Sequence, residues 1–244
     1  MEEEQIPFTK QMRKATREIH DLSDALVNAK LAFALSDFDV WAEGLLIFYE
    51  IFRFLEEAME RHKDSALGEL MVDGMKRTEA FEKDLSFYLG DDWASSYTPR
   101  ESVVKYLLYL RELEKKDPDL LMAFVYHLYM GLWSGGQILR KKRMVVRTVF
   151  PFVKETLGGN DVTDFGNNSV SKFKRTMSTT MNKIADTLSP EKKAKLIHES
   201  KMVFVLNNEI IRTVRGTTQI LVKKVLIFSL FIAVLCIIIA YIFK

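Results

Sequence analysis

The segment YHLYMGLWSGGQILRKKR, residues 126–143, has a helical pattern that is interrupted by glycines. Gly135 and Gly136 are adjacent, and Gly131 lies four residues before the first of them. Each glycine inside a helix costs about 1 kcal/mol relative to alanine. Because Gly131, Ser134 and Gly135 are spaced three and four apart, one side of the predicted helix is small. Two interpretations follow: another helix packs closely here, or the bare backbone approaches a flat ligand, with the glycine pair also allowing a bend.

The composition fits one helical domain with an appended segment. The chain has 244 residues, of which 48% are hydrophobic, and a formal net charge of +2. This charge gives no overall field that would attract nucleic acid. The single cysteine, Cys236, excludes an intrachain disulfide, and a structural zinc site is not expected without a Cys/His cluster.

Helix start signals recur along the chain, and no strand alternation of useful length is present. Thr98-Pro99 with Glu101, Asp117-Pro118 and Ser189-Pro190 are each typical of a helix N-terminus, and Ser36 with Asp39 is another candidate. The loop GGNDVTDFGNNS, residues 158–169, is predicted to be a flexible surface connection. The predicted helices cover approximately residues 8–30, 38–62, 73–89, 99–115, 118–148, 169–187 and 190–214.

The C-terminal stretch VLIFSLFIAVLCIIIAYIF, residues 225–243, is apolar and uncharged. A helix of this length spans about 30 Å, the thickness of a bilayer core. Lys223 and Lys224 precede it and only Lys244 follows, so the positive-inside rule places the preceding domain in the cytosol. We expect a tail anchor in the endoplasmic reticulum or a similar internal membrane; a buried core helix is the alternative. The predicted organisation is a flexible N-terminus (1–7), a helical domain (8–214), a juxtamembrane linker (215–224) and the anchor (225–243).

His20 is the strongest candidate metal ligand, because imidazole is a common ligand of haem iron. Arg13 and Arg17 precede it by seven and three residues, so all three side chains can share one side of a helix. Paired guanidiniums suit an anionic ligand with carboxylates, and haem is such a ligand. The plainer interpretation is a partly exposed histidine on a solvated face. His20 lies at the edge of a predicted apolar stripe of Met12, Ala15, Ile19, Leu22 and Leu26. Of the other histidines, His62 is interpreted as a surface residue, and His127 and His198 as structural residues on helices.

The sequence resembles the haem oxygenase family over roughly residues 8–212. The matching segments are KATREIH around His20, LEEAMERHKD at 55–64, YTP at 97–99 and YMGLWSGGQILRKK at 129–142, with a looser match in FKRTMSTTMN at 173–182.

The resemblance implies an all-α fold with a single multi-helical domain. Haem would lie between a proximal helix carrying His20, which would ligate the iron, and a kinked distal helix carrying Gly131, Gly135 and Gly136. The remaining positions that the resemblance implies are Arg13, Arg17 and Lys174 near the propionates, Tyr126 in contact with a propionate, and Asp24 beside the free N–H of His20. The implied reaction uses O2 and electrons from NADPH, which NADPH–cytochrome P450 reductase supplies, and yields biliverdin, CO and iron. Biliverdin reductase is a further implied partner.

Three distal positions depart from the family pattern. Leu132 stands where the family usually has an aspartate that holds water for proton delivery, Phe52 where it often has tyrosine, and Leu128 where it often has arginine. Because these side chains cannot replace the lost hydrogen bonds, we expect a drier pocket, with slow turnover or relaxed regiospecificity. Ser178 also replaces a basic residue near a propionate, which Arg175 could supply.

Three classes of function remain open. The first is a haem oxygenase; the second is a non-catalytic haem sensor or carrier tethered to a membrane, which the missing distal aspartate favours; the third is a tail-anchored adaptor that binds no haem. The joint presence of proximal and distal segments argues against the third. Lys141, Lys142 and Arg143 form a basic run that predicts either a docking surface for an acidic partner or a solvated helix face.

Overall fold

The computed structural model describes residues 6–31, 37–149 and 158–215, together with isolated positions between 222 and 236. Within these ranges the regular elements are all helical, so the predicted all-α class is confirmed. The longer helices are α1 (Phe8–Leu31), α2 (Phe38–Arg61), α4 (Thr78–Leu89), α6 (Glu101–Lys116), α7 (Met122–Gly131), α8 (Gln137–Val149), α9 (Val170–Asp186) and α10 (Pro190–Arg212). The short elements are α3 (Ala66–Glu69), α5 (Trp93–Ser96), η1 (Pro118–Leu121), η2 (Leu132–Gly136) and η3 (Asp161–Thr163).

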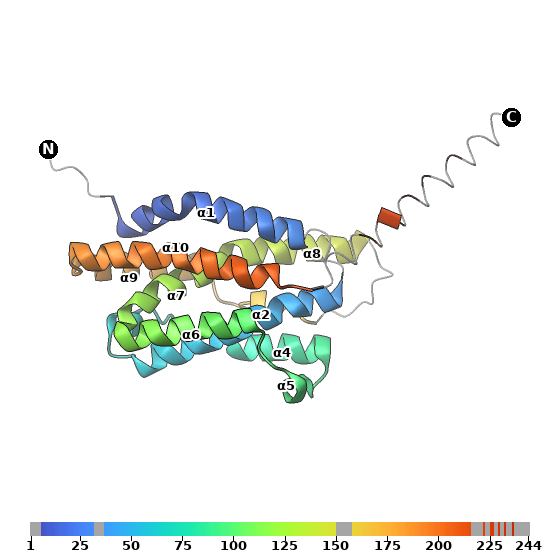
Figure 1. Ribbon diagram of the computed structural model, residues 1–244, viewed down its shortest axis with the longest axis horizontal. Coiled ribbons are helices and arrows are strands. Elements are labelled where there is room, and N and C mark those ends of the chain that lie inside the picture. Colours follow the sequence, from blue (N-terminus) through green and yellow to red (C-terminus); the bar gives the residue numbers. More distant parts are fainter. Residues whose placement is uncertain are drawn as a thin grey trace.

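The helices form two layers with α7 between them (Figure 1). On one side α1 packs along α10, and on the other α2 packs against α4 and α6. Most residues of α7 are buried, as expected for a helix whose sequence is largely apolar on all sides. The chain leaves α7 through η2 and α8, so the glycine-rich segment begins at the end of the central helix.

Local capping signals explain the starts of some of the helices. The Ser189 hydroxyl accepts a hydrogen bond from the Lys192 N–H at 3.2 Å, as the Ser-Pro pattern predicted. The prediction of Thr98 as an N-cap was wrong, because α6 begins at Glu101 after an extended Arg100. Ser36 lies outside the described residues, and Asp37 caps α2 by accepting from the Val40 N–H at 3.1 Å.

The start of α4 is set from another helix. The carboxylate of Glu56 on α2 accepts the backbone N–H groups of Arg77 and Thr78, at 2.5 and 3.2 Å. These are donors that a helix N-terminus leaves without intrahelical partners. The predicted start near residue 73 was therefore too early.

The loop at 158–169 was wrongly predicted to be a flexible surface connection. It carries η3, and Val162, Thr163 and Phe165 are buried. The carboxylate of Asp84 on α4 accepts the backbone N–H groups of Asp161 and Val162, at 2.8 and 3.0 Å. The loop is therefore part of the packed body of the domain.

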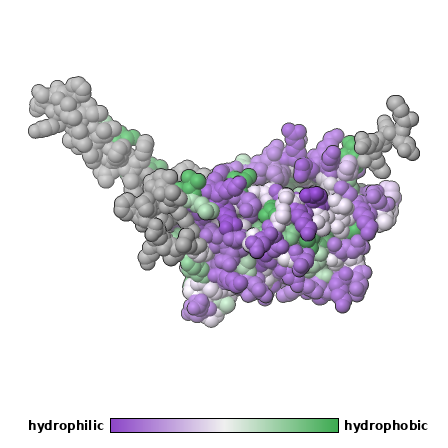
Figure 2. Space-filling model, turned by 180° about the vertical axis from the view of Figure 1, so that it is seen from behind, coloured by the Kyte–Doolittle hydropathy of each residue, from purple (hydrophilic) through white to green (hydrophobic). Residues whose placement is uncertain are grey.

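The face shown in Figure 2 is mostly hydrophilic, with small hydrophobic patches between charged side chains. Among the residues that the structure describes, no helix is long and apolar enough to cross a membrane. The predicted N-terminal segment (1–7), linker (215–224) and anchor (225–243) lie largely outside those residues.

Candidate functional site

His20 lies in the middle of α1, with 52% of its side chain exposed. Its Nδ1 is 3.5 Å from Oδ2 of Asp24, one helical turn later, and 4.0 Å from Oδ1 of Asp21. A carboxylate beside Nδ1 favours the tautomer with its proton there and leaves the lone pair on Nε2. No hydrogen bond reaches Nε2 from any described residue. His20 thus has the arrangement of a metal-ligating histidine with its supporting carboxylate.

The buried side of α1 differs from the predicted apolar stripe. Leu22 is 56% exposed, whereas Thr16 and Ser23 are buried. Their hydroxyls donate to the carbonyls of Met12 and Ile19 within the helix, at 3.0 and 2.9 Å, so burial leaves neither hydroxyl unpaired. The prediction for Leu22 was wrong because short hydroxyl side chains can turn to the core once they bond to their own helix.

The two ends of α1 are attached to different elements. Near the first turn, the Thr9 N–H donates to Oδ1 of Asn182 on α9 at 2.9 Å. At the far end, Nζ of Lys30 donates to the carbonyl of Arg212 on α10 at 3.2 Å. His20 lies between these attachments, on the helix that packs along α10.

A phenylalanine links His20 to the central helix. The ring of Phe204 on α10 lies 5.4 Å from the His20 ring and 5.1 Å from the ring of His127 on α7, both in edge-to-face contact. Gly131 follows His127 by one turn on the same side of α7, and Gly135 follows by about one more. Gly131 and Gly135 therefore lie on the side of α7 and η2 that carries His127, the side that contacts Phe204 of α10.

The three glycines differ in their surroundings. A Cβ atom built on Gly131 or Gly135 would meet no other atom within 4 Å, so both border open space. A Cβ atom on Gly136 would lie 3.1 Å from Cδ1 of Leu132 and 3.6 Å from Cγ2 of Thr163. Gly131 and Gly135 therefore leave backbone accessible to a ligand, while Gly136 admits the packing of Leu132 and of η3.

The glycine segment is a single stretch of π-helix, η2. Such stretches are rare and occur often at functional sites, where they insert an extra residue and redirect the chain. Gln137, at the end of this stretch, donates from Nε2 to the carbonyl of Thr163 at 2.7 Å. The predicted bend therefore takes the form of a π-helical turn supported by η3.

Apolar packing surrounds the distal segment where the family pattern has polar residues. Leu128 and Phe52 are 6% and 3% exposed, and Leu132 packs against the core. The ring of Phe52 contacts the ring of Tyr129 at 5.2 Å. The Tyr129 hydroxyl turns to the buried carboxylate of Glu56, at 2.7 Å. These positions therefore offer no polar group toward the open space beside Gly131 and Gly135.

The cations expected near the propionates remain available to an anion. Arg13 and Arg17 are exposed on α1 and Lys174 is half-buried on α9. None of the three forms an ion pair with a described residue, and Tyr126 is buried beside His127. The structure thus places Arg13 and Arg17 on the helix of His20, with unpaired positive charge.

Arg143 is buried, so its predicted place in a docking surface was wrong. Its guanidinium lies 4.3 Å from the ring of Trp41 and 5.0 Å from the ring of Tyr88. Lys141 and Lys142 are exposed. Arginine stacks on aromatic rings more readily than lysine, so the last residue of the basic run contributes to the core.

His62, predicted to be a surface residue, is only partly exposed and belongs to an ion-pair cluster. Its Nε2 lies 3.0 Å from Oε1 of Glu114, which in turn pairs with Arg61, and the group is half-buried. This cluster ties α2 to α6 and is not part of the site around His20.

Within the described ranges, no group of three or more His, Cys, Asp or Glu side chains could hold a metal ion. A metal bound through His20 must therefore bring further ligands with it, as a porphyrin does through its pyrrole nitrogens. The open space beside the glycines, the free Nε2 and the unpaired cations of α1 together fit haem, an iron porphyrin with carboxylates.

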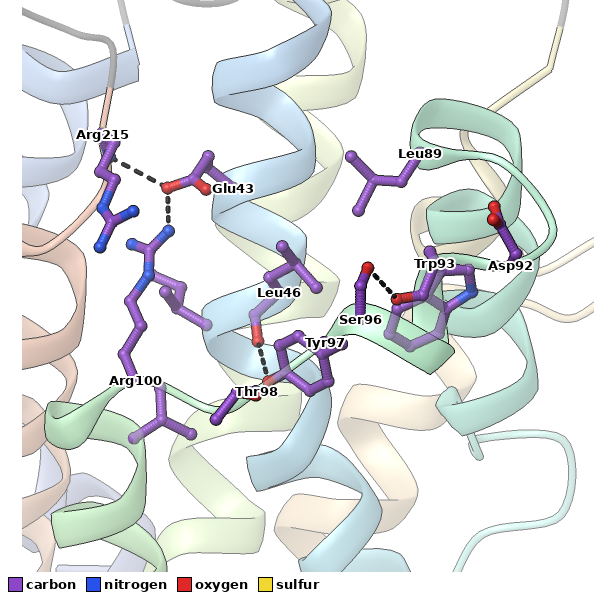
Figure 3. Close-up of a pocket in the computed structure, with 12 residues that line it drawn as sticks. Glu43, Leu46, Leu89, Asp92, Trp93, Ser96, Tyr97, Thr98, Arg100 and Arg215 are labelled. Atoms are coloured by element: carbon purple, nitrogen blue, oxygen red, sulfur yellow. Dashed lines mark hydrogen bonds and ion pairs between the residues drawn. The ribbon is translucent and has the colours of Figure 1, made fainter.

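A separate cavity of about 390 Å³ lies between α2, α5 and the start of α6 (Figure 3). The carboxylate of Glu43 binds the guanidinium of Arg100 and the backbone N–H of Arg215, and Arg100 also donates to the carbonyl of Thr213 at 2.6 Å. Trp93 forms part of the wall. The cavity contains none of the residues predicted to contact haem, and Glu43 and Arg100 in its wall are paired with each other.

A family model described as "Heme oxygenase" matches residues 6–213 of the chain. Heme oxygenase 1 of Gallus gallus is 29% identical over 205 residues, which cover 82% of this chain and 67% of the relative. Heme oxygenase 1 of Bos taurus is 26% identical over 211 residues, which cover 84% of this chain and 70% of the relative.

Solved structures give the same likeness. The crystal structure of heme oxygenase 2 from Chlamydomonas reinhardtii, solved without heme, has a TM-score of 0.76 and 29% identity and covers 86% of this chain and 98% of that one. Heme oxygenase-1 from Synechocystis, solved in complex with heme, has a TM-score of 0.77 and covers 92% of this chain and 100% of that one. Its identity of 22% supports a shared fold alone.

Proposed function

Because the chain belongs to the haem oxygenase family, we propose that it opens haem oxidatively to biliverdin, with release of CO and iron. The electrons come from NADPH through NADPH–cytochrome P450 reductase, and O2 is the oxidant. The observation that carries the proposal is His20, whose Nε2 is free and whose Nδ1 faces the carboxylate of Asp24 at 3.5 Å.

Each residue of the site has a defined part in binding. His20 ligates the iron through Nε2, and Asp24 holds the proton on Nδ1 and orients the ring. Arg13, Arg17 and Lys174 pair with the haem carboxylates, because their charges have no carboxylate partner among the described residues. Tyr126 contacts a propionate from α7.

The distal glycines position the ring for attack. Gly131 and Gly135 border open space, so the backbone of η2 can approach the porphyrin plane where a side chain would hold it away. Haem supplies the iron centre and the ring that is opened. The bare backbone restricts the space above the ring and so bears on which ring edge reacts.

Proton delivery is the weak element of the site. Leu132, Leu128 and Phe52 provide no hydrogen-bonding group, so ordered water has few partners on the distal side. We therefore infer slow turnover, or biliverdin isomers beyond the alpha form. The same three residues favour the second candidate function, a haem sensor or carrier that binds haem without cleaving it.

Spectroscopy and product analysis test both candidates. The full-length protein, kept soluble with mild detergent, is titrated with hemin as wild type, His20→Ala and His198→Ala, the last being an exposed control on α10. We expect a Soret band that His20→Ala changes and His198→Ala leaves intact. Addition of NADPH and the reductase is then expected to yield bilin slowly.

The possible outcomes separate the candidates. A Soret band that His20→Ala leaves unchanged contradicts the ligand assignment, and haem binding without any bilin supports the sensor or carrier. Rapid formation of the pure alpha isomer contradicts the inference about proton delivery and regiospecificity.

The membrane location belongs to the same proposal. The apolar segment 225–243 and the lysines before it support a tail anchor in the endoplasmic reticulum membrane, with the catalytic domain facing the cytosol. Fractionation of cells that express the chain with and without residues 225–243 tests this location, and equal amounts of both forms in the soluble fraction contradict it.

A further inference from the structure

His127 is a half-buried histidine whose Nε2 is buried without a hydrogen-bond partner among the described residues. It lies on α7, and this nitrogen is closed to water. Its contacts are the faces and edges of two aromatic rings, Tyr126 at 5.3 Å and Phe204 at 5.1 Å. A buried polar group without a partner is uncommon in a folded protein and calls for a specific explanation.

The position of His127 relates it to the candidate haem site. Phe204 contacts both His127 and His20, so one ring connects the two histidines. Gly131, which borders open space, is one turn further along the same side of α7. Tyr126, its neighbour in sequence, was assigned to a propionate by resemblance. The imidazole therefore lies at the edge of the region where haem is proposed to bind.

The surroundings of His127 keep its imidazole neutral. Burial lowers the pKa of His127 to about 3, and the positive charge of Arg13 acts in the same direction. A neutral imidazole carries one N–H donor, and an anion in this region would also be attracted to Arg13. The missing partner is therefore best supplied by a carboxylate oxygen.

We propose that His127 is a haem-binding residue that donates a hydrogen bond to a carboxylate of the bound haem, alongside Arg13. The inference rests on the proposed function, since it requires haem between α1 and α7. This contact would restrict rotation of the porphyrin within its own plane. A hydrogen bond has a narrow angular preference, whereas the attraction of the arginines for a carboxylate is less directional. His127 is thus a determinant of orientation as well as of affinity.

A haem carboxylate as partner accounts for a histidine at position 127, where an apolar side chain could fill the space around the buried Nε2. Without the ligand, the unpaired nitrogen lowers the stability of the folded chain. Replacement by an apolar side chain of similar size should therefore leave the haem-free protein as stable as wild type, or more stable, while haem binding weakens. A residue with a purely structural role would show the opposite response in the haem-free protein.

The test compares two ligands that differ only at the carboxylates. Hemin and its dimethyl ester are titrated into the full-length protein, followed by the Soret band, for wild type, His127→Leu and His198→Leu. The last variant is the matched control, because His198 is exposed on α10. We expect His127→Leu to weaken hemin binding roughly tenfold, to change ester binding less than about twofold, and to leave the urea midpoint of the haem-free protein unchanged or higher. We expect His198→Leu to behave as wild type.

Other outcomes overturn the proposal in distinguishable ways. Equal loss of affinity for hemin and ester means that the ring only fills space, and equal affinity for hemin in wild type and variant means that no contact exists. Should His127→Leu fail to fold, His127→Phe and His127→Gln carry the comparison, with hemin affinity expected to be greater in the glutamine variant because it retains a donor. A wild-type protein that binds neither compound overturns the proposed function itself, whereas wild-type binding with an indifferent His127 overturns only this inference.

Discussion

Oδ2 of Asp24 lies 3.5 Å from Nδ1 of His20, the ring nitrogen other than the Nε2 that we propose as the iron ligand. The two residues are one turn apart on α1, so the helix itself sets their distance. The proximal pair is therefore prearranged before any ligand binds.

The first prediction concerns this pair. Asp24→Asn should weaken hemin binding by roughly 10-fold to 100-fold, because an amide supports the ligating imidazole less well than a carboxylate. The iron–histidine stretching frequency, measured by resonance Raman spectroscopy, should fall. Asp21→Asn is the comparison, since its carboxylate lies at 4.0 Å and should matter less. Equal effects of the two substitutions would contradict the assignment.

The two glycines at the end of η2 should respond differently to alanine. Gly135→Ala should raise the free energy of unfolding of the haem-free protein by up to about 1 kcal/mol, because alanine favours helix and its Cβ meets no atom. Gly136→Ala should gain less or lose stability, because its Cβ would press on Leu132 at 3.1 Å. Hemin affinity should fall in Gly135→Ala, where the new methyl group faces the open space. Urea unfolding measures the stability and hemin titration the affinity. The same response of both variants in both assays would contradict the different surroundings of the two glycines.

Placing an acidic residue at 132 should not restore a fast enzyme. Leu132→Asp should lower the free energy of unfolding by about 1–3 kcal/mol, because it puts a carboxylate where an apolar side chain packs against the core. Bilin formation should stay slow, since Leu128 and Phe52 still offer water no partner. Leu132→Ala, which loses packing without adding charge, is the control in both assays. Full recovery of the alpha-specific rate in Leu132→Asp would show that this one position limits proton delivery.

Acid should destabilise the haem-free protein partly through His127. Its pKa is about 3 in the folded state against the ordinary value of 6.5, so the unfolded chain binds more protons between these values. The contribution of neutral His127 to the free energy of unfolding is therefore fully present above about pH 6.5. It is lost as the pH falls toward about 3, with a slope on the order of 1.4 kcal/mol per pH unit.

His127→Leu should remove this contribution. Between about pH 7.5 and about pH 5, wild type should lose about 2 kcal/mol more than the variant in urea unfolding experiments. Groups that titrate equally in both proteins cancel in this difference. Identical pH profiles would mean that the imidazole reaches solvent in the folded state.

The residues of the basic run after the glycines should differ in their contribution to stability, because Arg143 is buried and Lys142 is exposed. Arg143→Ala should lower the free energy of unfolding by roughly 2–4 kcal/mol, because its guanidinium lies among aromatic rings in the core. Lys142→Ala should stay within about 0.5 kcal/mol of wild type, as expected for an exposed residue. Thermal unfolding measures both. If the lysines guide the reductase, a charge reversal at Lys141 and Lys142 should raise the reductase concentration needed for half-maximal rate without changing hemin affinity.

Helical periodicity and start signals were enough to predict the class of the fold and most of its long helices. They failed where tertiary contacts decide. The start of α4 depends on Glu56, which is remote in sequence, and the loop around η3 is held by Asp84. Arg143 was misread because Trp41 and Tyr88, which surround it, lie far away along the chain.

The sequence indicated which helices carry the candidate site, but not the surroundings of each glycine or the unpaired nitrogen of His127. The spacing of Arg13, Arg17 and His20 on one helix is a local property, so the sequence could indicate it. Gly135 borders open space and Gly136 packs against Leu132 and Thr163. This difference depends on the π-helical turn and on the position of Thr163, which no local sequence pattern indicates. His127 was missed because a histidine on an apolar helix is usually a satisfied core residue, and only the packing reveals that its nitrogen is unpaired.

Leu132 and Gly136 cover one another across the π-helical turn, so their substitutions are not independent. A bulkier residue at 136 is disfavoured while leucine occupies 132, and an acidic residue at 132 leaves unfilled the space that leucine now occupies above the glycine. The effect of either substitution on stability therefore depends on the residue at the other position. Leucine at 132 and glycine at 136 therefore restrict each other, and a change to a polar distal turn is best made at both positions together.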